Sequence, residues 1–160
     1  MCIRDRSLQG VVERLREPGI ELVKGEALHR FLFDRSSSAE YLGAIGVLDE
    51  NGNVRYASVD ISPSERNFSD WDYFQVHRDA DDVGMYVSRP YRSPLRGGDE
   101  SIAISRRISR PDGSFAGVVV GSLRLAYFRD RFGTLSIGER DAITVFRNDG
   151  VVLVLSLIHI

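Results

Sequence analysis

The chain has 160 residues, of which 42% are hydrophobic, and its formal net charge at pH 7 is −2. This mildly acidic balance lacks the clustered basic charge with which proteins neutralise nucleic-acid phosphates, so we expect no nucleic-acid partner. No run of residues approaches the roughly 18 apolar positions that a membrane-spanning helix needs.

The first and last six residues mirror each other at the level of DNA. A DNA sequence that encodes residues 1–6 also encodes residues 155–160 when its reverse complement is read. This pattern is typical of a sequencing adapter translated at both ends of an assembled fragment, so we exclude both segments from fold reasoning. Without them the chain has no cysteine and only His29 and His77 as histidines, which excludes disulfides and thiolate metal sites.

Apolar residues recur at helical spacing from Leu8 to Leu15, which predicts a first helix. Pro18-Gly19 interrupts this pattern, and we expect a second helix over residues 26–34. We assign residues 7–40 to this helical segment. Two interpretations remain open: the helices pack on the following domain, or they form the lower part of a signalling stalk.

The next segment predicts a β-hairpin. Two β-rich runs, residues 43–48 and 54–58, flank Asn51-Gly52, and both of these turn residues tolerate the positive φ angles that tight hairpins need. A similar strand–turn–strand pattern surrounds Gly150 near the end of the chain.

Between the hairpins we expect a short helix with Ser69 as its N-cap and with Asp70 and Asp72 in its positively polarised first turn. The remaining elements are strands over residues 85–92, 101–109 and 115–125 and a helix over residues 126–132. The third of these strands is apolar throughout, which is typical of a central strand covered on both sides.

These elements predict an α+β fold with a PAS-like layout: N-terminal helices, a hairpin, a helix and then three antiparallel strands. The two hairpin turns, at Gly52 and Gly150, are separated along the sequence by the length of a whole module, so we expect two modules in tandem. Residues 41–134 form the first module, and residues 135–154 open a second one that is cut short.

Four segments carry a family resemblance: Asp49–Val54, Ser69–Phe74, Ser105–Ile108 and Asp112–Val119. In this order they resemble the double Cache (PDC-type) sensor domains that precede bacterial diguanylate cyclases and some histidine kinases. The resemblance implies a periplasmic sensor, tethered by flanking transmembrane helices, whose membrane-distal module binds a small molecule. The family often has Arg where Trp71 stands here, so a ligand contact by that Arg is not carried over.

The short helix supplies the first candidate ligand-binding residues. By their spacing Asp70, Tyr73, Phe74 and His77 share one face, and an acid, a phenol and an imidazole together suit the wall of a polar pocket. We therefore select Asp70, Tyr73 and His77, with Trp71 as a further contact or lid. The alternative is that Tyr73 and Phe74 pack in the core while Asp70 starts the helix.

The strands supply the other candidates, Arg89, Ser105 and Arg107. Ser105 and Arg107 share a strand face with Ala103, and small residues beside a guanidinium leave room for a carboxylate, which Arg grips with two hydrogen bonds. A carboxylate-bearing ligand is therefore one candidate. The alternative for Arg107 is a surface salt bridge.

Two acidic segments predict loops rather than a catalytic site or a metal site. Gly97-Gly98-Asp99-Glu100 superficially resembles a cyclase signature, but Ser101 follows where that signature has Phe, and we expect a turn. The acidic residues between 79 and 82 lack the spacing of an EF-hand calcium loop. We expect no catalytic residue, metal or cofactor.

The leading hypothesis is a small-molecule-sensing input domain of a bacterial membrane receptor, not itself an enzyme, that forms a homodimer through its stalk helices. Lys24 is the only lysine of the chain, an arginine preference typical of GC-rich bacterial DNA. A cytoplasmic PAS-type interaction or cofactor domain is the first alternative. A small enzyme that uses His77 with Asp70 as an acid–base pair is the second.

Overall fold

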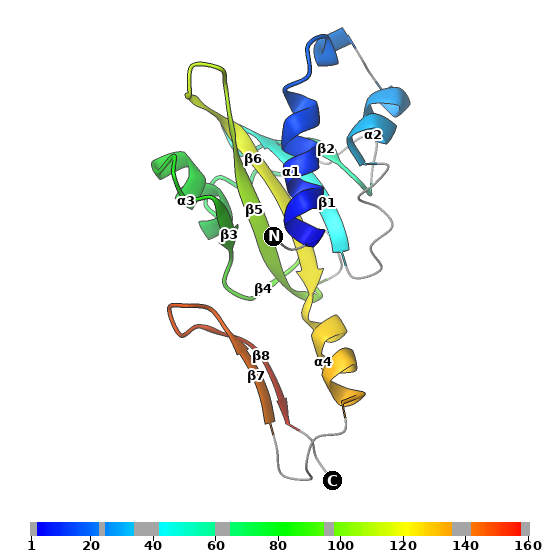
Figure 1. The fold of residues 1–160 in the computed structure, drawn as a ribbon, viewed down its shortest axis with the longest axis vertical. Coiled ribbons are helices and arrows are strands. Elements are labelled where there is room, and N and C mark those ends of the chain that lie inside the picture. Colours follow the sequence, from blue (N-terminus) through cyan, green and yellow to red (C-terminus); the bar gives the residue numbers. More distant parts are fainter. Residues whose placement is uncertain are drawn as a thin grey trace.

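Alternating apolar runs and glycine-containing turns fold the middle of the chain into a six-stranded antiparallel sheet (Figure 1). The computed structural model describes residues 3–22, 25–33, 42–59, 65–94, 98–135 and 142–157. The fold is α+β, as the sequence predicts, with helices on both faces of the sheet. Within the described residues no helix is both long enough and apolar enough to cross a membrane.

The strands of the sheet are paired in the order β2-β1-β6-β5-β3, and β4 also pairs with β5. Their bounds are β1 (Leu42–Asp49), β2 (Val54–Ala57), β3 (Met85–Val87), β4 (Tyr91–Arg92), β5 (Glu100–Ser109) and β6 (Phe115–Arg124). The helices are α1 (Ile3–Leu15), α2 (Gly25–Phe33), α3 (Asp72–Asp79) and α4 (Leu125–Gly133), with a short 3₁₀ turn, η1 (Ile20–Leu22). A separate hairpin consists of β7 (Ala142–Phe146) and β8 (Val152–Leu157).

The predicted hairpins, the strands over 101–109 and 115–125 and the helices at both ends are confirmed, but the single strand over 85–92 is wrong. Val87 pairs with Ile104 whereas Tyr91 pairs with Ser101, so one extra residue lies between β3 and β4. The hydroxyl of Ser88 accepts the Ala103 N–H at 2.8 Å. This side chain thus takes a place in the ladder that a backbone carbonyl would otherwise fill, and the strand bends as at a β-bulge.

The predicted start of the short helix is also wrong. Helix α3 begins at Asp72, its N-cap position is Trp71, and no side chain caps it. Ser69 instead donates its backbone N–H to Asn67 Oδ1 at 2.9 Å. Asp70 therefore precedes the helix, and only Asp72 lies in its first turn.

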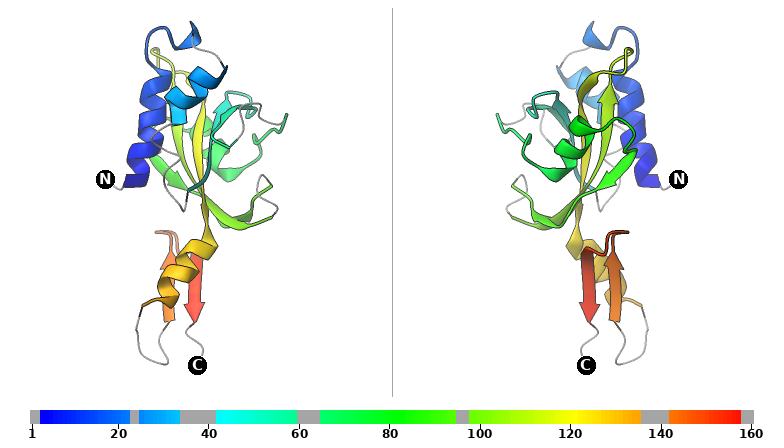
Figure 2. Two further views of the ribbon diagram at one scale, coloured as in Figure 1. Left: turned by 90° about the vertical axis from the view of Figure 1, so that its right-hand side faces the viewer. Right: turned by 90° about the vertical axis from the view of Figure 1, so that its left-hand side faces the viewer.

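The sheet separates two apolar cores. Figure 2 shows α1 and α2 on one side of the sheet and α3 on the other. Side chains alternate between faces along β5: Ile102 and Ile104 belong to the core under α1 and α2, and Ala103 belongs to the core under α3. The N-terminal helices thus pack on the domain, as one of the two interpretations holds, while their role in a stalk stays a prediction.

The β1–β2 turn positions the segment that leads into α3. Asp49 is 7% exposed and accepts the N–H groups of Asn51 and Asn53 at 3.0 and 2.9 Å. Burial alone would raise the pKa of Asp49, but these hydrogen bonds and the charge of Arg55 hold it below its usual value. Gly52 accepts the Phe68 N–H, and a Cβ at Gly52 would lie 2.6 Å from the Ser69 nitrogen.

The β7–β8 hairpin lies below the main sheet and is joined to it through α4 (Figure 1). Its buried residues Leu153 and Val154 belong to the same core cluster as Ile102 and Leu123 of the sheet. The hairpin is nevertheless a two-stranded sheet of its own. Its assignment as the opening of a second module stays a prediction.

Strands β1 and β6 approach so closely at Gly117 that only glycine fits. The residue has φ +141°, and a Cβ there would overlap the carbonyl oxygen of Leu48. At Gly46, on β1, a Cβ would make an ordinary contact of 3.6 Å with Val120 Cγ1.

We therefore expect Gly117→Ala to lower the free energy of unfolding by roughly 3 kcal/mol, because backbone strain adds to a steric overlap with the neighbouring main chain. The matched variant Gly46→Ala should change it by less than about 1 kcal/mol. Urea denaturation of both variants measures the difference. Equal effects of the two substitutions would contradict this account of the β1–β6 contact.

Candidate functional site

A cavity of about 50 Å³ lies on the α3 side of the sheet. The described residues that line it are Ala44, Ile45, Gly46, Leu48, Val54, Ala57, Phe68, Tyr73, Tyr91, Ser93, Val120 and Ser122. The small side chains on β1 and β6 leave this space open. By the measure in which a single water needs roughly 10–15 Å³, the cavity has room for a ligand of a few non-hydrogen atoms.

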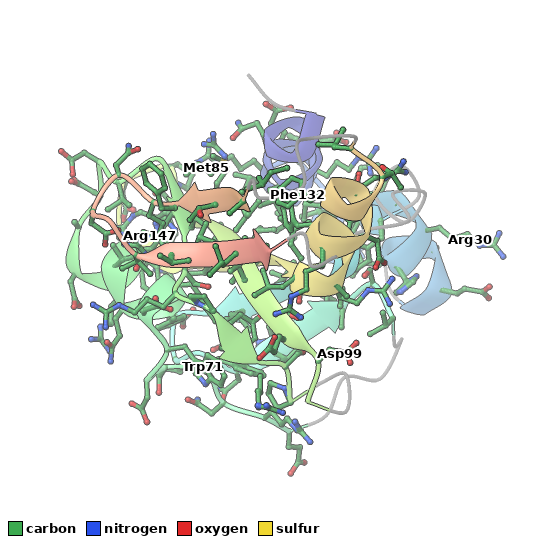
Figure 3. All side chains as sticks on the ribbon, turned by 90° about the horizontal axis from the view of Figure 1, so that it is seen from below. Arg30, Trp71, Met85, Asp99, Phe132 and Arg147 are labelled. Atoms are coloured by element: carbon green, nitrogen blue, oxygen red, sulfur yellow. The ribbon has the colours of Figure 1, made fainter. Side chains whose placement is uncertain are left out.

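Four aromatic rings form a cluster at this cavity, here called the aromatic cluster: Phe68, Trp71, Tyr73 and Tyr91. The Trp71 ring lies 5.9, 5.6 and 5.0 Å from the ring centroids of Phe68, Tyr73 and Tyr91. Figure 3 shows Trp71 on the opposite side of the molecule from α1. Trp71 thus does not line the cavity itself but packs on rings that do.

Two phenols and two serines, Tyr73, Tyr91, Ser93 and Ser122, provide polar groups at the cavity. The Tyr91 hydroxyl donates to Ser122 Oγ at 3.4 Å, which joins β4 to β6 across β5. Burial raises the pKa of both Tyr73 and Tyr91, so both phenols are neutral at physiological pH. They can donate and accept hydrogen bonds but supply no charge.

The Asp72 carboxylate links the start of α3 to the β3–β4 segment by hydrogen bonds. Its Oδ2 accepts the Tyr86 hydroxyl at 3.1 Å and the Arg89 N–H at 3.0 Å, and its Oδ1 accepts the Tyr73 N–H at 2.8 Å. Three donors therefore hold the carboxylate next to Tyr73, a residue of the cavity wall.

A second polar group of residues lies further along α3. His77 is fully buried, and its Nε2 lies 3.0 Å from Ser105 Oγ. Arg107 donates to the His77 carbonyl oxygen, and its guanidinium carbon lies 4.9 Å from the Phe115 ring centroid. Burial lowers the pKa of His77 to about 4, assisted by the charges of Arg107 and Arg106 and opposed by the Ser105 contact.

The structure therefore divides the sequence-predicted site residues into two groups. Tyr73 lines the cavity and Trp71 packs beside it, whereas His77, Ser105 and Arg107 contact one another outside the described wall. Asp70 and Arg89 are exposed. Asp70 does not share the α3 face with Tyr73, because α3 begins two residues later. A ligand-binding role for these residues stays a prediction.

Sequence reasoning missed Tyr91, Ser93, Ser122 and Gly46, which line the cavity from three different strands or their ends. Alternation along the predicted strands assigns residues to faces, but it does not tell which strand faces meet the same space. Tyr91 and Ser122 are 31 positions apart, and no local pattern links them.

In the part of the chain that the structure describes, no group of three or more His, Cys, Asp or Glu side chains could hold a metal ion. Asp79, Asp81 and Asp82 are exposed to solvent. Around the Gly-Gly-Asp-Glu segment, the Gly98 N–H donates to the Ser93 carbonyl, as in a turn, and Gly97 lies outside the described residues.

No model of a known protein family matches the sequence, and no curated protein sequence does. Solved structures do match. The extracellular domain of rpHK1S-Z16, a protein assigned as a histidine kinase, is 27% identical with a TM-score of 0.76; the match covers 94% of this chain and 61% of that one. The chain has the fold of an extracellular sensor domain.

Two chemoreceptors share this fold at lower identity. The ligand-binding domain of Pseudomonas fluorescens CtaA, in complex with L-alanine, has a TM-score of 0.62 at 22% identity, with 94% of this chain and 61% of that one covered. That of Campylobacter jejuni Tlp3, in complex with 4-methylisoleucine, has a TM-score of 0.69 at 13% identity, with 94% and 60% covered. This chain thus spans about three fifths of the length of these sensor domains.

The buried His77 predicts a loss of stability in mild acid. The unfolded chain protonates this group near its ordinary pKa of 6.5, and the folded chain only near a pKa of 4. The unfolded state therefore binds more protons between these pH values, and the free energy of unfolding falls as the pH drops through that window, by on the order of 3 kcal/mol.

Denaturation at a series of pH values should show that His77→Gln removes most of this dependence between pH 6.5 and 4. His29→Gln is the control, because His29, a residue of α2, contacts the Ala57 carbonyl instead. A His77→Gln variant with the same pH profile as the unmodified chain would show that His77 does not titrate in this way.

Proposed function

We propose that this chain is the ligand-sensing part of a bacterial transmembrane receptor, a double Cache domain that lies in the periplasm and forms a homodimer through its N-terminal helices. The observation that carries the proposal is the cavity between the aromatic cluster and the face of β1 and β6, in a fold shared with extracellular sensor domains. A diguanylate cyclase or histidine kinase output domain, which the Cache resemblance suggests, would lie outside the chain.

Binding without turnover fits the groups that the cavity provides. Its described wall supplies hydroxyl groups, and the nearby imidazole of His77 is fully buried against Ser105. The alternative enzyme mechanism needs Asp70 to pair with His77, but Asp70 is exposed and precedes α3. An exposed Asp70 and a buried His77 are a poor match for an acid–base pair, which needs the two groups within hydrogen-bond reach.

A chain of hydrogen bonds offers a route from the cavity to the β7–β8 hairpin. Arg147, in the hairpin turn, donates to the Tyr86 hydroxyl at 3.1 Å and to the Val87 carbonyl at 2.6 Å. The Tyr86 hydroxyl in turn donates to Asp72, which holds the N–H of Tyr73. Figure 3 shows Arg147 on the hairpin, with Met85 of β3 close by.

This chain of contacts gives the ligand a physical means to act on the hairpin. A ligand shifts a conformational equilibrium only as far as it binds one state better than the other. A ligand that prefers one position of Tyr73 would favour one position of Asp72, and with it one arrangement of Tyr86 and Arg147. The hairpin would then report occupancy of the cavity to the segments that follow it.

We expect Asp72→Asn and Arg147→Met to be coupled, because the Tyr86 hydroxyl contacts both side chains. In a double-mutant cycle on the free energy of unfolding, the coupling energy should be about 0.5–1 kcal/mol. Arg30→Met is the matched control, since Arg30 is an exposed residue of α2 (Figure 3) that pairs with Glu26. Additive effects of Asp72→Asn and Arg147→Met would rule out this route.

The proposal as a whole is tested by filling the cavity. A Cβ at Gly46 makes only ordinary contacts, and Gly46→Val adds two further methyl groups as apolar bulk to the cavity wall. Trp71 is the only tryptophan of the chain and packs on the cavity's aromatic rings, so its fluorescence reports binding. We expect a screen of small metabolites to yield a molecule that changes this fluorescence and that Gly46→Val no longer binds.

The control is Gly133→Val, the same change at the end of α4, where a Cβ has nothing within 4 Å. This variant should bind the molecule as the unmodified chain does. The proposed function fails if a broad screen yields no molecule whose binding Gly46→Val abolishes and Gly133→Val retains.

A further inference from the structure

The cavity differs from an amino-acid site in the charge of its wall. None of the described lining residues carries a side chain that is ionised at neutral pH: the wall consists of apolar groups and of the hydroxyls of Tyr73, Tyr91, Ser93 and Ser122. An amino acid brings a carboxylate and an ammonium group into its site. Burying either charge without a partner costs several kcal/mol.

Two charged side chains close to α3, Asp72 and Arg107, are already bound by groups of the protein itself. The Asp72 carboxylate already accepts three hydrogen bonds from Tyr73, Tyr86 and Arg89. Arg107, on β5, donates to the carbonyls of His77 and Gly113 and packs on Phe115 of β6. The sequence suggests that the Arg107 guanidinium binds a ligand carboxylate, but groups of the protein itself already bind this guanidinium.

We infer that the cavity takes an uncharged small molecule, with one carbonyl, amide or hydroxyl group beside a short apolar part. This inference rests on the proposed function and specifies its ligand. The hydroxyls at the cavity can donate to a carbonyl oxygen and accept from an amide or hydroxyl hydrogen. Apolar residues such as Leu48, Val54 and Val120 suit the apolar part. The volume of about 50 Å³ limits the ligand to roughly six non-hydrogen atoms.

Three probes of nearly equal shape separate size from charge: isobutyramide, isobutyrate and L-alanine. They have the same number of non-hydrogen atoms, but the first is neutral, the second an anion and the third a zwitterion. Titration calorimetry at pH 7, together with Trp71 fluorescence, should show isobutyramide binding at least about tenfold more tightly than the other two, a difference of about 1.4 kcal/mol.

Two variants, each with a matched control, assign this binding to the cavity. Gly46→Val should abolish isobutyramide binding, while Gly133→Val should leave it unchanged. Tyr91→Phe removes one hydroxyl from the wall and should weaken isobutyramide binding about fivefold or more, the effect of one lost hydrogen bond. Tyr127→Phe, on α4, is the matched control and should retain full affinity.

Tighter binding of isobutyrate or L-alanine, abolished by Gly46→Val, would overturn the uncharged ligand class and leave the proposed function standing. Failure of isobutyramide to bind, or binding that Gly46→Val does not affect, would also overturn the inference. The proposed function itself is decided separately, by the broad metabolite screen with the same cavity-filling variant.

Discussion

Strand β6 pairs with a strand on each side and contributes side chains to two apolar cores. It lies between β1 and β5 in the sheet, and its side chains alternate between the core under α1 and α2 and the core under α3. Val119 and Leu123 belong to the first core, and Val118 to the second. A strand in this position must be apolar on both faces, and it admits β1 closely only because residue 117 is glycine.

The same constraint creates the cavity. On the face of the sheet that meets α3, several strand positions carry small residues, among them Ala44, Gly46 and Ser122. The aromatic cluster spans this face, with Trp71 packed on Tyr73 of α3 and Tyr91 of β4. Planar rings over small side chains leave a space that close packing would normally fill. The other face, under α1 and α2, is filled by larger apolar side chains.

Asp72 joins the cavity to the rest of the molecule. It is the first residue of α3, where the positive end of the helix dipole favours its charge, and it binds the segment that follows β3. The Tyr86 hydroxyl donates to the same carboxylate and accepts a hydrogen bond from Arg147 of the hairpin. A short chain of charge-assisted contacts thus connects the aromatic wall to a part of the chain more than sixty positions away, and such contacts are stronger than neutral ones.

The sequence by itself determined the elements and their order, because apolar periodicity and Asn-Gly or Asp-Gly turns are local properties. It correctly placed the two hairpins and the central strand 115–125, and the alternation along β5 correctly separated the isoleucines from Ala103. Only the tertiary structure decided which side chains meet. Ser88 interrupts the predicted strand because its hydroxyl bonds a neighbouring strand, and Arg107 turns to the His77 carbonyl. These contacts depend on sheet register and helix position, which long-range packing fixes and no local pattern encodes.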